Sequence, residues 1–153
     1  MAGIFAVYEA DETDVDNAVA AAKSASATWK ALSPGERGVY LRRFADLIEE
    51  SQDELKGIEA IATGKPVSQF FEAQVAASFF RYFAEAGWNA QGTASLNTPG
   101  HVNISVKQPF GVVACITPWN LPILLFAYKV APALAAGNTV VHKSSERAPL
   151  SVS

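Results

Sequence analysis

Over residues 13–91, apolar side chains recur every three to four positions, which is the pattern of helices that bury one face. The pattern predicts a first helix with Thr13 or Asp14 as its N-cap. Ser33, Pro34 and Glu36 form a capping box with proline at the first helical position, which predicts the start of a second helix.

Two further helices are predicted in the same segment. Ser51 and Glu54 repeat the capping box and open a third helix, which Gly64 and Pro66 end. A fourth, long helix is predicted from about Val67 to Gln91. Its stripe of aromatic residues indicates a core or an interface and gives no reason to expect a cofactor site.

Apolar and polar residues then alternate from His101 to Lys107, which predicts a half-buried strand with Val102, Ile104 and Val106 on one face. Residues 4–8 are a second candidate for a short strand.

The pattern changes again near residue 111. Val112–Thr117 is a continuous apolar and β-branched run, as expected for a strand covered on both faces, and Pro118 ends it. A helix is predicted from Pro122 to Ala136, kinked or split at Pro132, followed by a strand at Thr139–His142. Strand, crossover helix and strand predict a parallel βαβ unit over about residues 111–143.

Polar groups follow both predicted strands. Asn120 comes shortly after the first, and Lys143 and Glu146 come after the second. Ligands of parallel-sheet proteins bind outside the carboxyl ends of the strands, so these three side chains are expected to converge at one site.

Composition excludes several classes of function. The net charge is −3 with dispersed Lys and Arg, so no basic stripe suggests nucleic-acid binding. A single cysteine excludes an internal disulfide framework. The longest apolar stretch, Leu121–Ala136, contains Lys129 and is too short to span a bilayer. The N-terminus lacks the basic region of a secretory signal or transit peptide, so a cytoplasmic location is expected.

With these elements and polar residues taken together, the sequence resembles the aldehyde dehydrogenase superfamily. The most specific similarity lies in Pro118–Asn120, Ala131–Asn138 and Lys143–Glu146, within a similar run from Val106 to Leu150. Two upstream segments are also similar: Thr63–Pro66 and Phe83–Trp88. The resemblance implies an α/β fold, in which residues 1–153 form an incomplete N-terminal part of a doubly wound cofactor-binding domain. A helix-rich first two thirds would precede the βαβ unit, and the strand near 101–107 would belong to an arm that joins subunits.

The resemblance gives Asn120 the role of oxyanion-hole donor. Its amide would donate to the oxygen of the thiohemiacetal that forms when a cysteine attacks the aldehyde; a donor of this kind is worth about 3–4 kcal/mol in another enzyme class. The alternative is that Asn120 caps the helix that starts at Pro122.

The resemblance also implies an NAD site. Lys143 and Glu146 match positions that hold the adenosine ribose, and a carboxylate there repels a 2′-phosphate and so favours NAD over NADP. The alternative is a solvated loop in which Ser144 or Ser145 caps a helix after Pro149. The segment before Asn120 would line the nicotinamide half, unless it is ordinary strand-end packing. The implied cofactor-binding residues are Ile116, Thr117, Pro118, Trp119, Lys143, Ser145 and Glu146.

Three apolar residues, Leu121, Leu125 and Tyr128, share one helix face and match positions that border the aldehyde tunnel of the family. The alternative is that they are core residues. Lys129 beside them either approaches the site or extends to water. No metal ligands are expected.

The chain departs from the family pattern where the nucleophile and general base belong, because in the family both lie in segments beyond Ser153. Cys115 is inside a predicted buried strand and is expected to be a core residue. His142 stands where the family usually has an apolar residue, and we expect it to be packed or partly exposed.

Two functions are therefore considered. In the first, the chain is part of an NAD-dependent aldehyde dehydrogenase that oxidises an aldehyde to a carboxylic acid through a cysteine thioester, and whose intact form is a homo-oligomer; the isolated chain is expected to be inactive. In the second, it is a non-catalytic truncated product or an oligomerisation module. A sheet ending at Thr139–His142 exposes a strand edge, so we expect poor solubility, a molten state or self-association.

Overall fold

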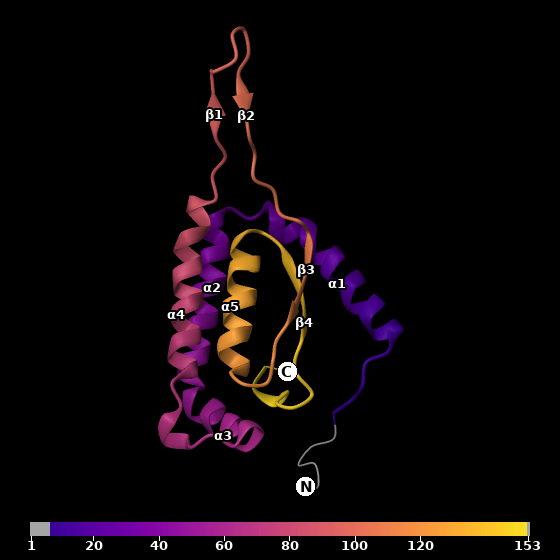
Figure 1. The fold of residues 1–153 in the computed structure, drawn as a ribbon, viewed down its shortest axis with the longest axis vertical. Helices are drawn as coiled ribbons and strands as arrows, with labels where there is room; N and C mark the ends of the chain where they lie inside the picture. Colours follow the sequence, from indigo (N-terminus) through magenta and orange to yellow (C-terminus); the bar gives the residue numbers. More distant parts are fainter. Residues whose placement is uncertain (1–6, 153) are drawn as a thin grey trace.

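A computed structural model describes residues 7–152 and shows a helix-rich first part followed by a βαβ unit, as predicted (Figure 1). The helices are α1 (Glu12–Ala31), α2 (Pro34–Glu50), α3 (Gln52–Thr63), α4 (Glu72–Ala86) and α5 (Pro122–Ala135). The strands are β1 (Ala94–Ser95), β2 (Asn103–Ile104), β3 (Val112–Ile116) and β4 (Thr139–Lys143). Short 3₁₀ helices are η1 (Val67–Gln69), η2 (Gly87–Asn89) and η3 (Leu150–Val152). The candidate strand at 4–8 lies largely outside the described residues, and Val7 and Tyr8 are not in a strand.

The starts of the first two helices show how local sequence sets a helix boundary. At α2 the predicted capping box is confirmed, because Ser33 Oγ accepts from the Glu36 N–H at 3.3 Å and Glu36 accepts from the Ser33 N–H at 2.7 Å. The predicted cap of α1 is wrong: Asp11 is the N-cap, and Asp14 is its capping-box partner one turn later. Asp11 and Asp14 exchange reciprocal bonds, which satisfy two backbone donors that a cap at Thr13 would leave free.

The box predicted at Ser51 is also wrong, although α3 does begin there. Ser51 ends α2 and starts α3 at once, with a backbone N–H that donates to Leu47, and its side chain caps neither helix. At the other end of α3 the prediction is confirmed: Gly64 adopts φ 75°, and its N–H donates to the carbonyl of Ala60 at 3.0 Å.

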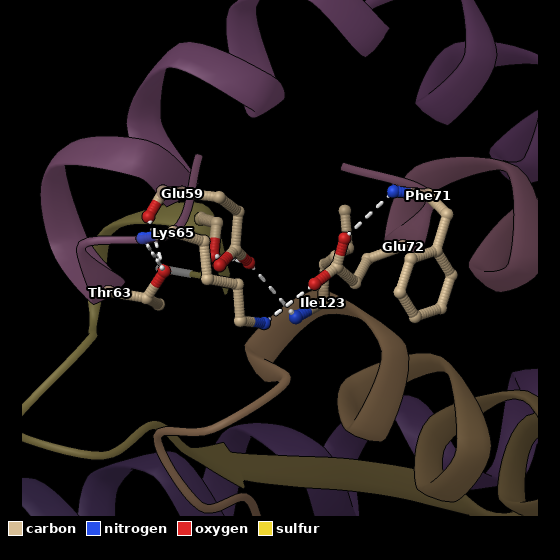
Figure 2. A network of polar contacts seen from close by, with 7 residues as sticks. Glu59, Thr63, Lys65, Phe71, Glu72 and Ile123 are labelled. Carbon is tan, nitrogen blue, oxygen red and sulfur yellow. Dashed lines mark hydrogen bonds and ion pairs between the residues drawn. The ribbon is translucent and has the colours of Figure 1, made fainter. Parts of the chain in front are cut away.

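The single long helix predicted from Val67 to Gln91 is broken at both ends. Residues 67–69 form η1, Phe70 is extended, α4 begins only at Glu72, and η2 replaces its C-terminal turn. At the N-terminal break, the buried Glu72 carboxylate accepts from Lys65 Nζ at 2.6 Å and from the Phe71 N–H at 2.9 Å, contacts that favour a new helix start at Glu72 (Figure 2).

The core lies where α2, α4 and α5 pack against one another. Phe80 of α4 is fully buried, with its ring centroid 4.5 Å from Phe44 and 6.3 Å from Phe126. The aromatic stripe of α4 is thus core on one face, while Tyr82 on the other face is exposed.

Side chains from α1 and α2 fasten these helices to the C-terminal end of α5. Trp29 Nε1 donates to the carbonyl of Leu134 at 3.0 Å, and buried Arg37 donates to the carbonyls of Ala135 (3.1 Å) and Leu32. These contacts satisfy carbonyls that the ends of the helices leave without an intrahelical partner.

The β1–β2 hairpin projects from the helical body (Figure 1). The strand predicted at 101–107 is reduced to Asn103–Ile104, and its predicted half-burial is wrong. Val102, Ile104 and Val106 are 64%, 69% and 71% exposed, because no second layer covers the hairpin within residues 7–152.

The parallel βαβ unit is confirmed: β3 pairs with β4 from Val112↔Thr139 to Ile116↔Lys143, with α5 on one side of the strands and α1 on the other (Figure 1). Three details differ from the prediction. The strand β3 ends one residue early at Ile116, and it is not covered on both faces, because Ile116 is 66% exposed. Pro132 does not split α5, which continues through the proline to Ala135.

The predicted stop after α5 is confirmed. Gly137 has φ 87°, and the N–H groups of Gly137 and Asn138 donate to Leu134 and Ala133. Within residues 7–152, no helix has the length and apolar character needed to cross a membrane.

Candidate functional site

The carboxyl ends of β3 and β4 lie at the same edge of the sheet. Ile116 is the register partner of Lys143, and the N–H of Thr117 donates to the carbonyl of Lys143 at 3.1 Å. The segments that follow the two strands therefore leave the sheet side by side. This arrangement brings the residues predicted to bind the cofactor, 116–119 and 143–146, to one edge.

Thr117 and His142 join the two strands at this edge. Thr117 is buried, and its Oγ1 shares a 2.9 Å hydrogen bond with Nε2 of His142. The His142 ring packs edge-on against Phe126 with centroids 4.9 Å apart, and burial lowers the pKa of His142. The imidazole is therefore neutral near pH 7. His142 is packed and partly exposed as predicted, but its bond to Thr117 was not foreseen.

Asn120 does not cap α5. The N-cap is Leu121, and no side chain bonds to the helix from that position. The alternative interpretation of Asn120 as a helix cap is therefore wrong. Asn120 is exposed, as are Pro118 and Trp119, and no hydrogen bond joins its side-chain amide to another residue in the part of the chain that the structure describes. The amide is free to donate to a ligand.

Lys143 and Glu146 form an ion pair with Nζ and Oε2 3.2 Å apart, and their side chains are 63% and 69% exposed. The pKa of Glu146 lies below its ordinary value because of a backbone hydrogen bond and the Lys143 ammonium. The pair thus presents a hydrogen-bond donor and a charged acceptor to solvent, which is the chemistry that a ribose diol requires.

Ser145 is buried and shapes the turn between these residues and η3. Its Oγ accepts from the Arg147 N–H at 3.3 Å, and its carbonyl accepts from the Ala148 N–H at 3.2 Å. The alternative in which Ser145 caps a helix after Pro149 is wrong, because the side chain bonds within its own turn.

The three residues predicted to border the substrate tunnel lie in the first turns of α5 or immediately before it. Leu121 and Leu125 are half-buried, and Tyr128 is exposed with its ring edge-on to Phe79, 5.4 Å between centroids. Lys129 is exposed to solvent.

Cys115 lies on β3 and is 3% exposed, and burial raises the pKa of its thiol. It has the character of the predicted core residue and not of a nucleophile. An open apolar groove of about 1000 Å³ between α1, α2, α5 and β4 meets the site only at His142. Within residues 7–152, no three Asp, Glu, His or Cys side chains are placed so that they could hold a metal ion.

The chain thus contains a parallel βαβ unit, with polar groups in the segments that follow the carboxyl ends of its strands. Residues 2–153 match the sequence profile of the aldehyde dehydrogenase family, and this chain belongs to that family. Aldehyde dehydrogenase 1 of Tanacetum cinerariifolium is 45% identical over 148 residues, which cover 94% of this chain and 30% of that protein. The NADP/NAD-dependent aldehyde dehydrogenase PuuC of Escherichia coli is 39% identical over 142 residues, or 90% of this chain and 29% of that protein.

Solved structures agree with the sequence comparisons. The crystal structure of PnpE in complex with nicotinamide adenine dinucleotide superposes with a TM-score of 0.91 at 43% identity, covering 97% of this chain and 31% of that one. The chain thus spans about 30% of the length of the relatives that it matches.

Proposed function

We propose that this chain forms the oxyanion side and part of the adenosine side of an NAD-dependent aldehyde dehydrogenase, which oxidises an aldehyde to a carboxylic acid through a cysteine thioester. The proposal is supported by the uncommitted amide of Asn120, which follows β3, and by the exposed Lys143–Glu146 pair, which follows β4, because β3 and β4 end at the same edge of the sheet. The PnpE structure with bound dinucleotide supports the choice of cofactor.

In this proposal each group has a distinct task. The Asn120 amide donates to the oxygen that becomes negative when a thiolate attacks the aldehyde, and it is worth about 3–4 kcal/mol if it acts as in the enzyme class where such a donor was tested. Lys143 donates to the ribose hydroxyls and Glu146 accepts from them. Bound NAD supplies the hydride acceptor. Exposed Ile116 and Trp119 offer apolar surface to the nicotinamide half.

The nucleophile is not among these groups. Cys115 is the only cysteine of the chain, and it is buried with a raised thiol pKa. We therefore propose that the chain by itself has no dehydrogenase activity. Leu121, Leu125 and Tyr128 would contribute only an apolar border to the aldehyde path.

The test of the cofactor proposal is the preference between NAD and NADP. In calorimetric titrations of the purified chain we expect NAD to bind about tenfold more tightly than NADP, because Glu146 repels the 2′-phosphate. Glu146→Gln should bring the two affinities to within about threefold. The matched control is Glu50→Gln, which alters another exposed ion pair, with Arg43, far along the sequence from the site. Absence of NAD binding, or an unchanged preference in Glu146→Gln, would contradict the proposal.

A second candidate function rests on the β1–β2 hairpin. Its exposed apolar residues favour an oligomerisation module, in which the hairpin joins copies of the chain. Sedimentation of the wild-type chain should then show a dimer or larger species, and Ile104→Lys should shift it to monomer. Val39→Lys, at an exposed apolar position on α2 (58% exposed, against 69% for Ile104), is the control and should leave the oligomer intact. A monomeric wild-type chain would exclude this candidate.

A further inference from the structure

Glu59, near the end of α3, is a buried carboxyl group that the functions above do not use. Its residue is 1% exposed, and its Oε1 accepts from two donors: Ser151 Oγ at 2.7 Å and the N–H of Ile123 at 3.4 Å. Figure 2 shows the Glu59 side chain directed toward the first turn of α5.

The contact with Ile123 supplies what α5 lacks. The N-cap of this helix makes no side-chain hydrogen bond, and the first N–H groups of any helix have no partner inside the helix. A carboxylate is also favoured at the positive end of the helix dipole. Glu59 therefore provides an acceptor from another helix, at a position three residues after Asn120.

The contact with Ser151 reaches the other half of the candidate site. Ser151 lies in η3, five residues after Glu146, and the buried turn at Ser145 connects the two. One carboxylate oxygen thus joins the segment that follows Asn120 to the segment that follows Lys143 and Glu146.

The second carboxylate oxygen of Glu59 indicates that stability alone does not account for a glutamate at this position. Oε2 is buried and has no hydrogen-bond partner among the described residues. An unsatisfied buried polar atom is costly, and an apolar side chain of similar size would avoid that cost. Joining two loops in one arrangement is a role that an apolar side chain does not fill, because it accepts no hydrogen bond.

We propose that Glu59 is a positioning residue that fixes the distance between the Asn120 segment and the Lys143–Glu146 segment. That the two segments bind NAD rests on the proposed function, whereas the hydrogen bonds by which Glu59 links them do not. The experiment therefore needs one measurement of the link and another of ligand binding.

The link is measured by amide resonances of the ¹⁵N-labelled chain. Because one oxygen serves both donors, Ser151→Ala should shift the Ile123 and Asn120 amides although the mutation lies in η3. Glu59→Leu should shift the amide resonances of both segments. Glu59→Gln keeps an acceptor oxygen and should leave most of these resonances at their wild-type positions. The matched control is Glu54→Leu, at an exposed glutamate on the same helix, which should not shift the amide resonances of either segment.

Binding is measured by calorimetric titration with NAD. We expect Glu59→Leu to weaken NAD binding about tenfold and Glu59→Gln to stay within about threefold of wild type. If Glu59→Leu fails to fold, Ser151→Ala still decides, since an unchanged Ile123 amide would overturn the proposal. Glu59→Gln behaving like Glu59→Leu would also overturn it. A wild-type chain that does not bind NAD would refute the proposed function, while the amide shifts would still decide the link.

Discussion

Replacing Phe80 with alanine is expected to lower the free energy of unfolding by about 3–5 kcal/mol, the range for a large aromatic side chain removed from a core. Phe80 is fully buried between α2 and α5, with the rings of Phe44 and Phe126 as neighbours. The loss combines the transfer of the ring to water with the cavity left among residues that cannot fully collapse. Urea denaturation followed by circular dichroism measures the change.

The control for Phe80 lies on the same helix. Tyr82 is 65% exposed, so Tyr82→Ala removes a comparable ring without opening the core, and its effect should be within about 1 kcal/mol. Phe80→Leu keeps most of the volume and should cost less than Phe80→Ala. Equal midpoints for Phe80→Ala and Tyr82→Ala would show that the core is not centred on Phe80.

Replacing Lys65 with methionine is expected to cost about 3–5 kcal/mol at neutral pH, because it leaves the Glu72 carboxylate buried without its cation. Glu72 is fully buried, and Lys65 Nζ lies 2.6 Å from its Oε1. Burial is the largest single influence on the pKa of Glu72 and raises it, but the hydrogen bonds from Lys65 and from backbone N–H groups outweigh burial, so that the pKa lies below its ordinary value.

The pH dependence separates this effect from simple loss of packing. Since the folded-state pKa of Glu72 is lowered, its stabilising contribution is complete above the unfolded-state pKa and is lost as the pH falls through the folded-state value. The difference between wild type and Lys65→Met should therefore be largest near pH 7 and shrink on acidification, as Glu72 becomes protonated in both proteins. Denaturation at several pH values measures this.

Two comparisons make the Lys65 result specific. Arg43→Met removes an exposed ion pair with Glu50 and should cost no more than about 1 kcal/mol. Adding Glu72→Leu to Lys65→Met should recover part of the loss, because it removes the unpaired buried charge. A loss of the same size at every pH would argue against an ionised Glu72 as its cause.

How well the sequence alone predicts a feature depends on how many residues separate the interacting groups along the chain. The Ser33–Glu36 box and the Gly64 stop depend on neighbours within four residues, so the pattern predicted them correctly. The break before α4 coincides with a contact between Lys65 and the buried Glu72, which periodicity does not record. The Ser51 box failed because the same residue also ends the preceding helix.

The candidate site follows the same rule. Parallel strands joined by a helical crossover must end at one edge, so the shared position of Thr117 and Lys143 could be predicted from the strand pattern. The bond between Thr117 and His142, and the carboxyl group of Glu59 at the start of α5, connect positions 25 and 64 residues apart. Only the packed structure brings such pairs together.

The fluorescence of Trp29 can be used to follow the position of α1 in this protein. Trp88 and Trp119 are already about half exposed to water, whereas the Trp29 N–H is engaged at the C-terminal end of α5. Detachment of the first helix would therefore change the emission spectrum mainly through this one residue, so that tryptophan fluorescence would report whether α1 is docked against α5.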